Sequence, residues 1–256
     1  MPKRIAMLLP NTATLSSLML GVVAIMLLSE QKFLIATIFI MLGAVLDVLD
    51  GQLAERLGAT SDIGKQLDSL ADVVTFGVAP TILIYYLMLH VGVIQPVAIA
   101  SSLAFVVAGA FRLARFNTMP SDRNAHFKGM PIPMGSALLI TGTFWQGWTI
   151  NLWWALVVLM VSYLMVSPFS YPKSKHILAY PPIIWIAVIA AALVGWLMAG
   201  WQAVPFGLMI VYAVSGPILS TFFTTRRRIH EHRARKKQII VNEEVDEEVD
   251  EVIDLK

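Results

Sequence analysis

The sequence contains no cysteine and few charged residues. Of its 256 residues 14% are charged and 57% are hydrophobic, whereas an average soluble domain has about 25% charged residues. The absence of cysteine excludes disulfide bonds, thiolate metal sites and cysteine nucleophiles. The scarcity of charge excludes an ordinary soluble core and favours a protein that spans the lipid bilayer.

Long apolar runs occupy most of the chain. A helix that crosses a bilayer needs about 20 mostly apolar residues. We expect eight such spans, at residues 12–29, 33–54, 68–89, 96–115, 132–149, 151–168, 181–199 and 203–223. The predicted fold is therefore an all-α, polytopic transmembrane helical bundle.

The positive charges fall on alternate connections between these spans. If the amino terminus is cytoplasmic, the cytoplasmic segments hold the basic tail together with Lys3, Arg4, Arg56, Lys65, Arg112, Arg115, Arg123, Lys128, Lys173 and Lys175. The opposite side holds only Lys32. Because cytoplasmic loops of membrane proteins carry the excess of Lys and Arg, we expect both termini in the cytoplasm.

The last part of the chain differs in composition from the rest. Residues 225–237 are strongly basic, and residues 238–256 alternate Val or Ile with acidic pairs. The basic half suits anionic lipid headgroups, and the acidic half resembles a disordered or partner-binding segment. We therefore expect a transmembrane domain at residues 1–224 and a disordered cytoplasmic tail at residues 225–256.

Four aspartates stand at facing ends of the second and third expected spans. Asp47 and Asp50 are three residues apart and share one helix face. Asp68 and Asp72 are four apart and share a face of the next helix. Because a short connection joins these two antiparallel helices, both pairs can point into one space. Carboxylates without soft ligands suit Mg²⁺ or Mn²⁺, and two such ions can bridge a diphosphate.

Small residues accompany the aspartates. Gly51 directly follows Asp50, and Ala54 lies one turn further on. Gly64 lies one turn before Asp68. Each of these small residues leaves room for a substrate beside the helix backbone.

Two other interpretations of the aspartates remain open. They can be ordinary helix-end charges that Arg56 and Lys65 neutralise. They can also form part of a cation or proton pathway, since ionisable groups at membrane depth are usually functional. The other spans carry almost no ionisable residues to continue such a pathway, which disfavours transport.

The spacing of these residues resembles the signature of the CDP-alcohol phosphatidyltransferase family, D-x-x-D-G-x-x-A-R followed after eight residues by G-x-x-x-D-x-x-x-D. The residues at signature positions are Asp47, Asp50, Gly51, Ala54, Gly64, Asp68 and Asp72. Within the family, the stretches QLDSLADVVTFGVAP (66–80), FRLARFN (111–117) and FKGMPIP (127–133) are most similar to the integral-membrane phosphatidylserine synthases of bacteria. The resemblance covers roughly residues 8–175.

The resemblance implies an enzyme that transfers the phosphatidyl group of CDP-diacylglycerol to L-serine by a two-metal mechanism. Asp47, Asp50 and Asp68 would hold one Mg²⁺ or Mn²⁺ ion, and Asp47, Asp68 and Asp72 the other. Asp72 would also act as the general base on the acceptor hydroxyl. The resemblance further implies contacts to the CDP-lipid from Gly51, Ser61 and the segment from Asn11 to Thr14.

Three cations are expected on the same side of the membrane as the aspartates. Arg112 and Arg115 stand three apart at the inner end of the fourth span, and Lys128 follows in a loop braced by prolines. They can bind the lipid diphosphate or the serine carboxylate, or they can anchor the chain to headgroups. The full predicted substrate-binding set is Asn11, Thr14, Gly51, Ala54, Ser61, Gly64, Arg112, Arg115 and Lys128.

Two positions differ from the family pattern. Glu55 occupies the signature arginine position, with Arg56 one place later, and Ser17 stands where relatives usually carry asparagine. A carboxylate at position 55 would repel the phosphates of a CDP-lipid. The alternatives are the same chemistry with glycerol phosphate or inositol phosphate as acceptor, and a catalytically weakened family member that acts as a membrane scaffold.

The expected partners are CDP-diacylglycerol, L-serine and the lipid bilayer, and no nucleic acid is expected. The resemblance also implies a homodimer. Together with the charge pattern, it predicts an integral protein of the bacterial inner (cytoplasmic) membrane with its active site facing the cytoplasm.

Overall fold

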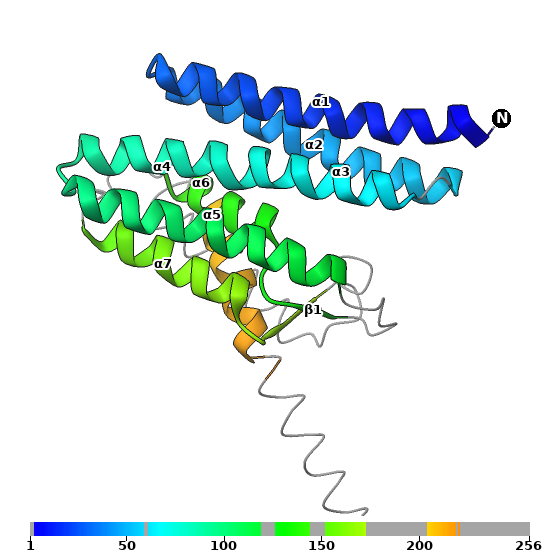
Figure 1. Cartoon of the computed structure of the whole chain (residues 1–256). Helices are drawn as coiled ribbons and strands as arrows, with labels where there is room; N and C mark the ends of the chain where they lie inside the picture. Colours follow the sequence, from blue (N-terminus) through cyan, green and yellow to red (C-terminus); the bar gives the residue numbers. More distant parts are fainter. Residues whose placement is uncertain are drawn as a thin grey trace, which may run out of the picture. The chain divides into compact units, whose positions relative to one another are not determined.

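The computed structural model describes residues 3–58, 61–118, 126–143, 152–172, 204–218 and 220. Its labelled elements are α1 (Lys3–Ser29), α2 (Phe33–Leu57), α3 (Asp62–Asp72), the π-helix η1 (Val73–Val78), α4 (Ala79–His90), α5 (Gln95–Thr118), β1 (His126–Lys128), α6 (Ile132–Thr143), α7 (Leu152–Val166) and β2 (Ser170–Pro172). A further helix covers Val204–Ile218. Figure 1 shows α1 beside α2, and α5 beside α7, with the stretch formed by α3, η1 and α4 running between the two pairs.

Four helices are long and apolar enough to cross a membrane, namely Leu8–Ser29, Phe33–Leu57, Asp62–His90 and Gln95–Thr118. They coincide with the first four expected spans. The shorter apolar helices Ile132–Thr143, Trp153–Val166 and Val204–Ile218 coincide in part with the fifth, sixth and eighth. The chain is thus a helical integral membrane protein. The count of eight spans and the side of the termini stay predictions, because the expected span 181–199 and the tail 225–256 lie outside the described residues.

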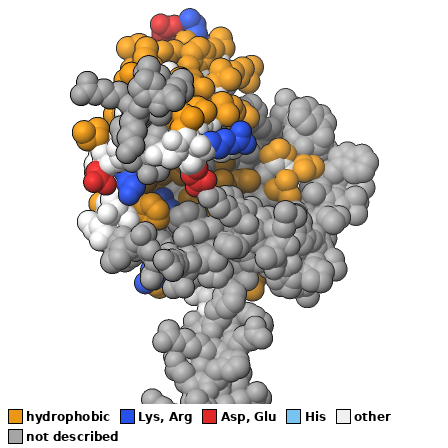
Figure 2. All heavy atoms as spheres, turned by 90° about the vertical axis from the view of Figure 1, so that its right-hand side faces the viewer, with side chains coloured by type: hydrophobic (Ala, Val, Ile, Leu, Met, Phe, Trp, Pro, Cys, Tyr) orange, Lys and Arg blue, Asp and Glu red, His pale blue; other side chains and the backbone are white. Residues whose placement is uncertain are grey.

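Large hydrophobic side chains are exposed on one face of α1. Leu15, Met19 and Met26 have 43%, 67% and 61% of their surface exposed. They are spaced four and seven residues apart and therefore share one helix face. Figure 2 shows hydrophobic side chains over much of the described surface on one side, with charged side chains in small groups. Such a surface suits contact with lipid rather than water.

Helices α1, α2 and η1 approach closely at two glycines. A Cβ at Gly21 would lie 2.6 Å from Oγ1 of Thr75, and a Cβ at Gly43 would lie 2.7 Å from its Cγ2. The Thr75 hydroxyl donates to the carbonyl of Ser17 at 3.1 Å, and the Ser17 hydroxyl donates to the carbonyl of Gly43 at 2.9 Å. Small residues let membrane helices pack this closely, and interhelical hydrogen bonds reinforce the contact. The contact therefore fixes the start of η1, which follows Asp72 directly.

The end of α2 and the start of α3 are set by local sequence. Gly58 ends α2 with φ of 58°, and its N–H donates to the carbonyls of Ala54 and Glu55. Only glycine adopts this left-handed conformation at little cost. Ser61 begins α3, where its Oγ accepts a hydrogen bond from the N–H of Gly64 at 3.0 Å, as a helix N-cap does. The chain therefore turns back between the two aspartate pairs.

A two-stranded antiparallel pair joins β1 to β2, with Phe127 opposite Tyr171. The sequence predicts only a loop around Lys128, so this small sheet is an addition to the helical prediction. After β1, Gly129 has φ of 80° and its N–H donates to the carbonyl of Phe169 at 2.8 Å. The chain after β1 is thereby held against the segment that follows α7.

Candidate functional site

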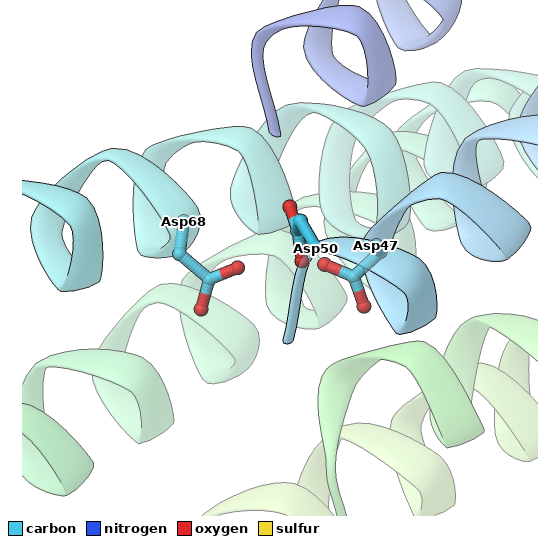
Figure 3. Close-up of side chains that lie close together, drawn as sticks. All are labelled: Asp47, Asp50 and Asp68. Carbon is cyan, nitrogen blue, oxygen red and sulfur yellow. The ribbon is translucent and has the colours of Figure 1, made fainter. Parts of the chain in front are cut away.

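Three aspartate carboxylates from two helices meet at one point. Asp47 and Asp50 come from α2 and Asp68 comes from α3, and one carboxylate oxygen of each lies within 4.8 Å of the others. Figure 3 shows Asp50 between Asp47 and Asp68, whose carboxylates are turned inward. The structure therefore brings together three of the four aspartates that the sequence singles out.

Asp72 is the last residue of α3, one turn beyond Asp68, and it lies outside the group of three. Its side chain is buried, with 8% exposed. Its charge interacts unfavourably with Asp47 and Asp68 and favourably with Arg112 of α5. Its Oδ1 has no hydrogen-bond partner among the residues that the structure describes. Because a buried carboxylate oxygen without a partner is costly, this atom marks a position where a ligand is expected.

The four carboxylates repel one another in this arrangement. Two unit charges about 4 Å apart interact by about 4 kcal/mol at the effective dielectric constant of a protein surface. Cations or protons between the carboxylates would remove that cost. Hard divalent cations prefer oxygen ligands, so the group of Asp47, Asp50 and Asp68 fits Mg²⁺ or Mn²⁺, with the unpartnered Oδ1 of Asp72 one turn beyond Asp68.

The cations nearest to the four aspartates in sequence are Lys65 and Arg56. Lys65 lies 4.0 Å from Asp62, with both side chains exposed, and Arg56 is exposed at the end of α2. Within the described part of the chain, no ion pair joins Lys65 or Arg56 to the four aspartates. The structure therefore gives no support to the interpretation that these residues are neutralised helix-end charges.

The predicted substrate residues at the start of the chain lie beside the aspartates. Thr14 is buried, and its hydroxyl donates to Oδ2 of Asp50 at 2.5 Å. A Cβ at Gly64 would lie 3.2 Å from Oδ1 of Asn11 and 3.0 Å from Oγ of Ser61. Asn11, Ser61 and Gly64 therefore meet in one place, whereas Thr14 reaches an aspartate.

The carboxyl end of α2 is open beside the aspartates. Among the described residues, no heavy atom would lie within 4 Å of a Cβ at Gly51. Ala54 is half-buried, and the following Glu55 is exposed. This side of α2 therefore has room for a ligand next to Asp50.

Arg112 lies against the aspartates from α5. It is buried, with 6% of its surface exposed, and its charge interacts with that of Asp72. Its guanidinium carbon lies 5.5 Å from the centroid of the Phe116 ring, close enough for a cation–π interaction. A buried cation is thus held beside the buried carboxylate that the resemblance implies as general base.

Arg115, one turn further along α5, binds backbone carbonyls. Its Nη1 donates to the carbonyl of Val166 and its Nη2 to the carbonyl of Lys128, each at 2.9 Å. Val166 is the last residue of α7, where helix carbonyls lack intrahelical partners and a cation is favourable. Lys128 itself ends β1 and is exposed. Two arginines on one face of α5 therefore have different surroundings.

Asn117, in the same stretch, is a residue whose contact the sequence did not reveal. Its Nδ2 donates to Oγ of Ser69 at 2.8 Å and so joins α5 to α3 beside Asp68. The stretch FRLARFN contains this asparagine, but nothing in its spacing indicates a partner 48 residues away.

An apolar cavity of about 880 Å³ runs along α2. Its lining includes Val48 and Leu49, which stand between Asp47 and Asp50 in the chain. Across the cavity, α6 contributes apolar residues such as Ala137. A cavity with this lining suits a hydrocarbon chain rather than a polar ligand.

Comparison with known proteins gives a consistent result. Residues 7–163 match the family model described as CDP-alcohol phosphatidyltransferase. A CDP-diacylglycerol–serine O-phosphatidyltransferase of Helicobacter pylori is 34% identical over 223 residues, which cover 84% of this chain and 92% of that protein. The enzymes of that name from Bacillus subtilis and Methanocaldococcus jannaschii are 37% identical over 168 residues (65% of this chain, 91% of that protein) and 35% identical over 208 residues (80% and 90%). With its four aspartates inside the matched region, the chain belongs to the CDP-alcohol phosphatidyltransferase family.

Proposed function

We propose that this protein transfers the phosphatidyl group of CDP-diacylglycerol to L-serine, giving phosphatidylserine and CMP. The observation that carries the proposal is the convergence of signature aspartates from α2 and α3 at one point. Serine as the acceptor rests on the similarity to relatives named as serine O-phosphatidyltransferases.

The four aspartates are proposed to hold two divalent cations, Mg²⁺ or Mn²⁺. Asp47, Asp50 and Asp68 would ligate one ion, and Asp47, Asp68 and Asp72 the other. When bound, the ions neutralise the carboxylates and stabilise negative charge on the phosphates of the donor. The set of carboxylate donors and the unpartnered Oδ1 of Asp72 support this assignment.

Asp72 is proposed as the general base. It takes the proton of the serine hydroxyl, whose oxygen attacks the phosphorus bonded to the diacylglycerol. The new bond joins that phosphorus to the serine oxygen. The bond from the same phosphorus to the bridging oxygen breaks, and CMP leaves with that oxygen. Catalysis of this kind comes mainly from positioning and electrostatics.

The remaining polar and small residues are proposed to bind the two substrates. Arg112 would face the diphosphate or the serine carboxylate from α5, with Lys128 exposed on β1. The open side of α2 at Gly51 and the group formed by Asn11 and Ser61 would accommodate the cytidylyl part of the donor. The apolar cavity along α2 supports a donor whose acyl chains stay in an apolar environment.

The site is proposed to face the cytoplasm from a bacterial inner membrane, with eight spans and a homodimer as the assembly. The chain has no cysteine, so single cysteines can report the orientation without background. In intact cells, a membrane-impermeant maleimide should label Gln31→Cys, whereas Lys65→Cys should react only after permeabilisation. The reverse pattern would contradict the proposed orientation.

The test of function is CMP release by the purified protein in detergent. The assay contains CDP-diacylglycerol and Mn²⁺ or Mg²⁺, with serine, glycerol phosphate, inositol phosphate or no acceptor. Serine-dependent release is expected. If CMP release depends on glycerol phosphate or inositol phosphate, that alcohol is the acceptor in place of serine. Binding of the CDP-lipid without CMP release would favour a scaffold role.

A further inference from the structure

The Thr14 hydroxyl donates to a carboxylate, whereas the other hydroxyl groups near it on α1 donate to backbone carbonyls. Its Oγ1 lies 2.5 Å from Oδ2 of Asp50 and 3.0 Å from the carbonyl of Pro10. A hydroxyl has one proton to donate, and the shorter separation is typical of an O–H bound to a carboxylate. By contrast, Thr12 is exposed and its hydroxyl donates to the carbonyl of Leu9, within α1 itself.

The hydrogen bond between Thr14 and Asp50 is buried, and a second hydrogen bond between α1 and α2 lies close to it. Each of the two residues has 4% of its surface exposed, so water competes little for the hydrogen bond. Three residues further along α1, the Ser17 hydroxyl binds the carbonyl of Gly43 in α2. The position of α1 relative to α2 is therefore fixed within one turn of Thr14.

We infer that Thr14 is a positioning residue of the divalent-cation site, whose hydroxyl holds the Asp50 carboxylate in the orientation that binds the ion. A carboxylate has about four lone-pair sites, so Asp50 can accept from Thr14 and still ligate a cation. Groups that orient metal ligands in this way typically change metal affinity about 10- to 100-fold when they are removed. The inference rests on the proposed function, because it presupposes an ion at Asp47, Asp50 and Asp68.

This role differs from a direct contact between Thr14 and the CDP-lipid, which the family resemblance implies. An orienting hydroxyl affects metal binding even when no lipid is present. A hydroxyl that touches the donor affects the KM for CDP-diacylglycerol and leaves metal binding unchanged. The two roles are therefore separable by measurement.

The experiment measures Mn²⁺ binding by electron paramagnetic resonance on the purified full-length protein in detergent, without CDP-lipid. Thr14→Val removes the hydroxyl and keeps the shape, and Thr14→Ser keeps the hydroxyl. Ser16→Ala is the matched control, because the Ser16 hydroxyl donates to the carbonyl of Thr12 within α1 itself. Thr14→Val is expected to bind Mn²⁺ about tenfold more weakly, while Thr14→Ser and Ser16→Ala bind it as the wild type does. In the CMP-release assay, Thr14→Val should need about tenfold more Mn²⁺ for half-maximal rate, with KM for CDP-diacylglycerol unchanged at saturating Mn²⁺.

If Thr14→Val binds Mn²⁺ with wild-type affinity, the inference is wrong. If that variant has a raised KM for CDP-diacylglycerol, Thr14 contacts the substrate instead. Thr14→Ala serves as a second hydroxyl-free variant if Thr14→Val does not fold. Absence of Mn²⁺ binding by the wild type would overturn the proposed cation site itself, and the inference with it. The two failures are thus distinguishable.

Discussion

The acidic region at the ends of α2 and α3 and the basic region at the end of α5 are built in different ways. In the acidic region, three carboxylates lie within 4.8 Å of one another, so their charge remains available for a ligand. In the basic region, Arg112 lies beside Asp72, while Arg115 binds carbonyls at the ends of α7 and β1. The negative charges therefore lie together, whereas one of the two arginines lies beside an aspartate and the other binds backbone carbonyls of the fold.

This difference shows that equal spacing does not give equal roles. Asp47 and Asp50 stand three residues apart and meet at one point. Arg112 and Arg115 also stand three apart, yet they reach different partners. Arg115 binds carbonyls of β1 and of the end of α7, whereas Arg112 lies beside Asp72 of α3.

The largest effect is expected when Asp72, the proposed general base, is replaced. Asp72→Asn is expected to reduce serine-dependent CMP release by about 10²- to 10⁴-fold, as loss of a general base does. Binding of one Mn²⁺ ion in the absence of CDP-lipid should persist, because Asp47, Asp50 and Asp68 are unchanged, whereas the second proposed ion loses its Asp72 ligand. The matched control is Asp62→Asn, which alters an exposed aspartate of the same helix and should leave the rate unchanged. Near-wild-type release by Asp72→Asn would end the general-base assignment.

The basic region should split into two phenotypes. Arg112→Gln is expected to lower kcat/KM about 10- to 100-fold, since a hydrogen bond to a charged group contributes about 1.5–3 kcal/mol, and also to lower the Tm, because the buried Asp72 loses its neighbouring cation. Arg115→Gln should lower the Tm alone, because backbone carbonyls of Val166 and Lys128 lose their donor. At low temperature its KM should stay close to that of the wild type. Both variants are compared by activity and by thermal unfolding in detergent. A raised KM with a normal Tm for Arg115→Gln would show that Arg115, like Arg112, acts on the substrate.

The packing behind the acidic region can be tested by filling one glycine. Gly43→Ala places a Cβ 2.7 Å from Cγ2 of Thr75 and should destabilise the protein by about 1–3 kcal/mol, as overpacking does. Thr75→Ser removes that methyl group and keeps the hydroxyl, so the double variant should recover much of the loss. Gly21→Ala is the control, because its Cβ would meet Oγ1 and Cα of Thr75, which serine retains. Equal rescue of both alanine variants would show that the described contacts are not the cause.

The smallest effect is expected at the departure from the family signature. Glu55 is exposed beside the open end of α2, so Glu55→Arg replaces a repulsive charge by an attractive one near the proposed phosphates. An exposed ion pair contributes up to about 1 kcal/mol, and KM for CDP-diacylglycerol should fall by at most about fivefold. Arg56→Gln, on the neighbouring exposed position, is the control. An unchanged KM for Glu55→Arg would place position 55 away from the donor.

The parts of the fold that the sequence predicted are those governed by local patterns. The first four spans follow from apolar length, and the approach of Asp47 and Asp50 to Asp68 follows from helical spacing and a short connection. The helix ends at Gly58 and Ser61 obey local capping chemistry too, although the expected spans ended at residue 54 and began at residue 68.

The parts that the sequence did not predict depend on contacts between distant segments. Thr14 meets Asp50 across 36 residues, and Arg115 meets Val166 across 51. The pairing of β1 with β2 likewise joins segments separated by two helices. In each case the residue types allow many partners, and only the packed arrangement of helices selects one.

The π-helix η1 has a consequence for how this protein can vary. In an α-helix each residue turns the chain by about 100°, so inserting or deleting a residue normally rotates everything beyond it. The wider turn at Val73–Val78 lies between the aspartate-bearing α3 and the apolar α4. Deletion of one residue from η1 would convert the π-helix towards an α-helix. Asp68 and Asp72 precede η1, so their positions relative to each other would not change. The junction therefore separates the aspartate-bearing half of a long apolar helix from length changes in its other half.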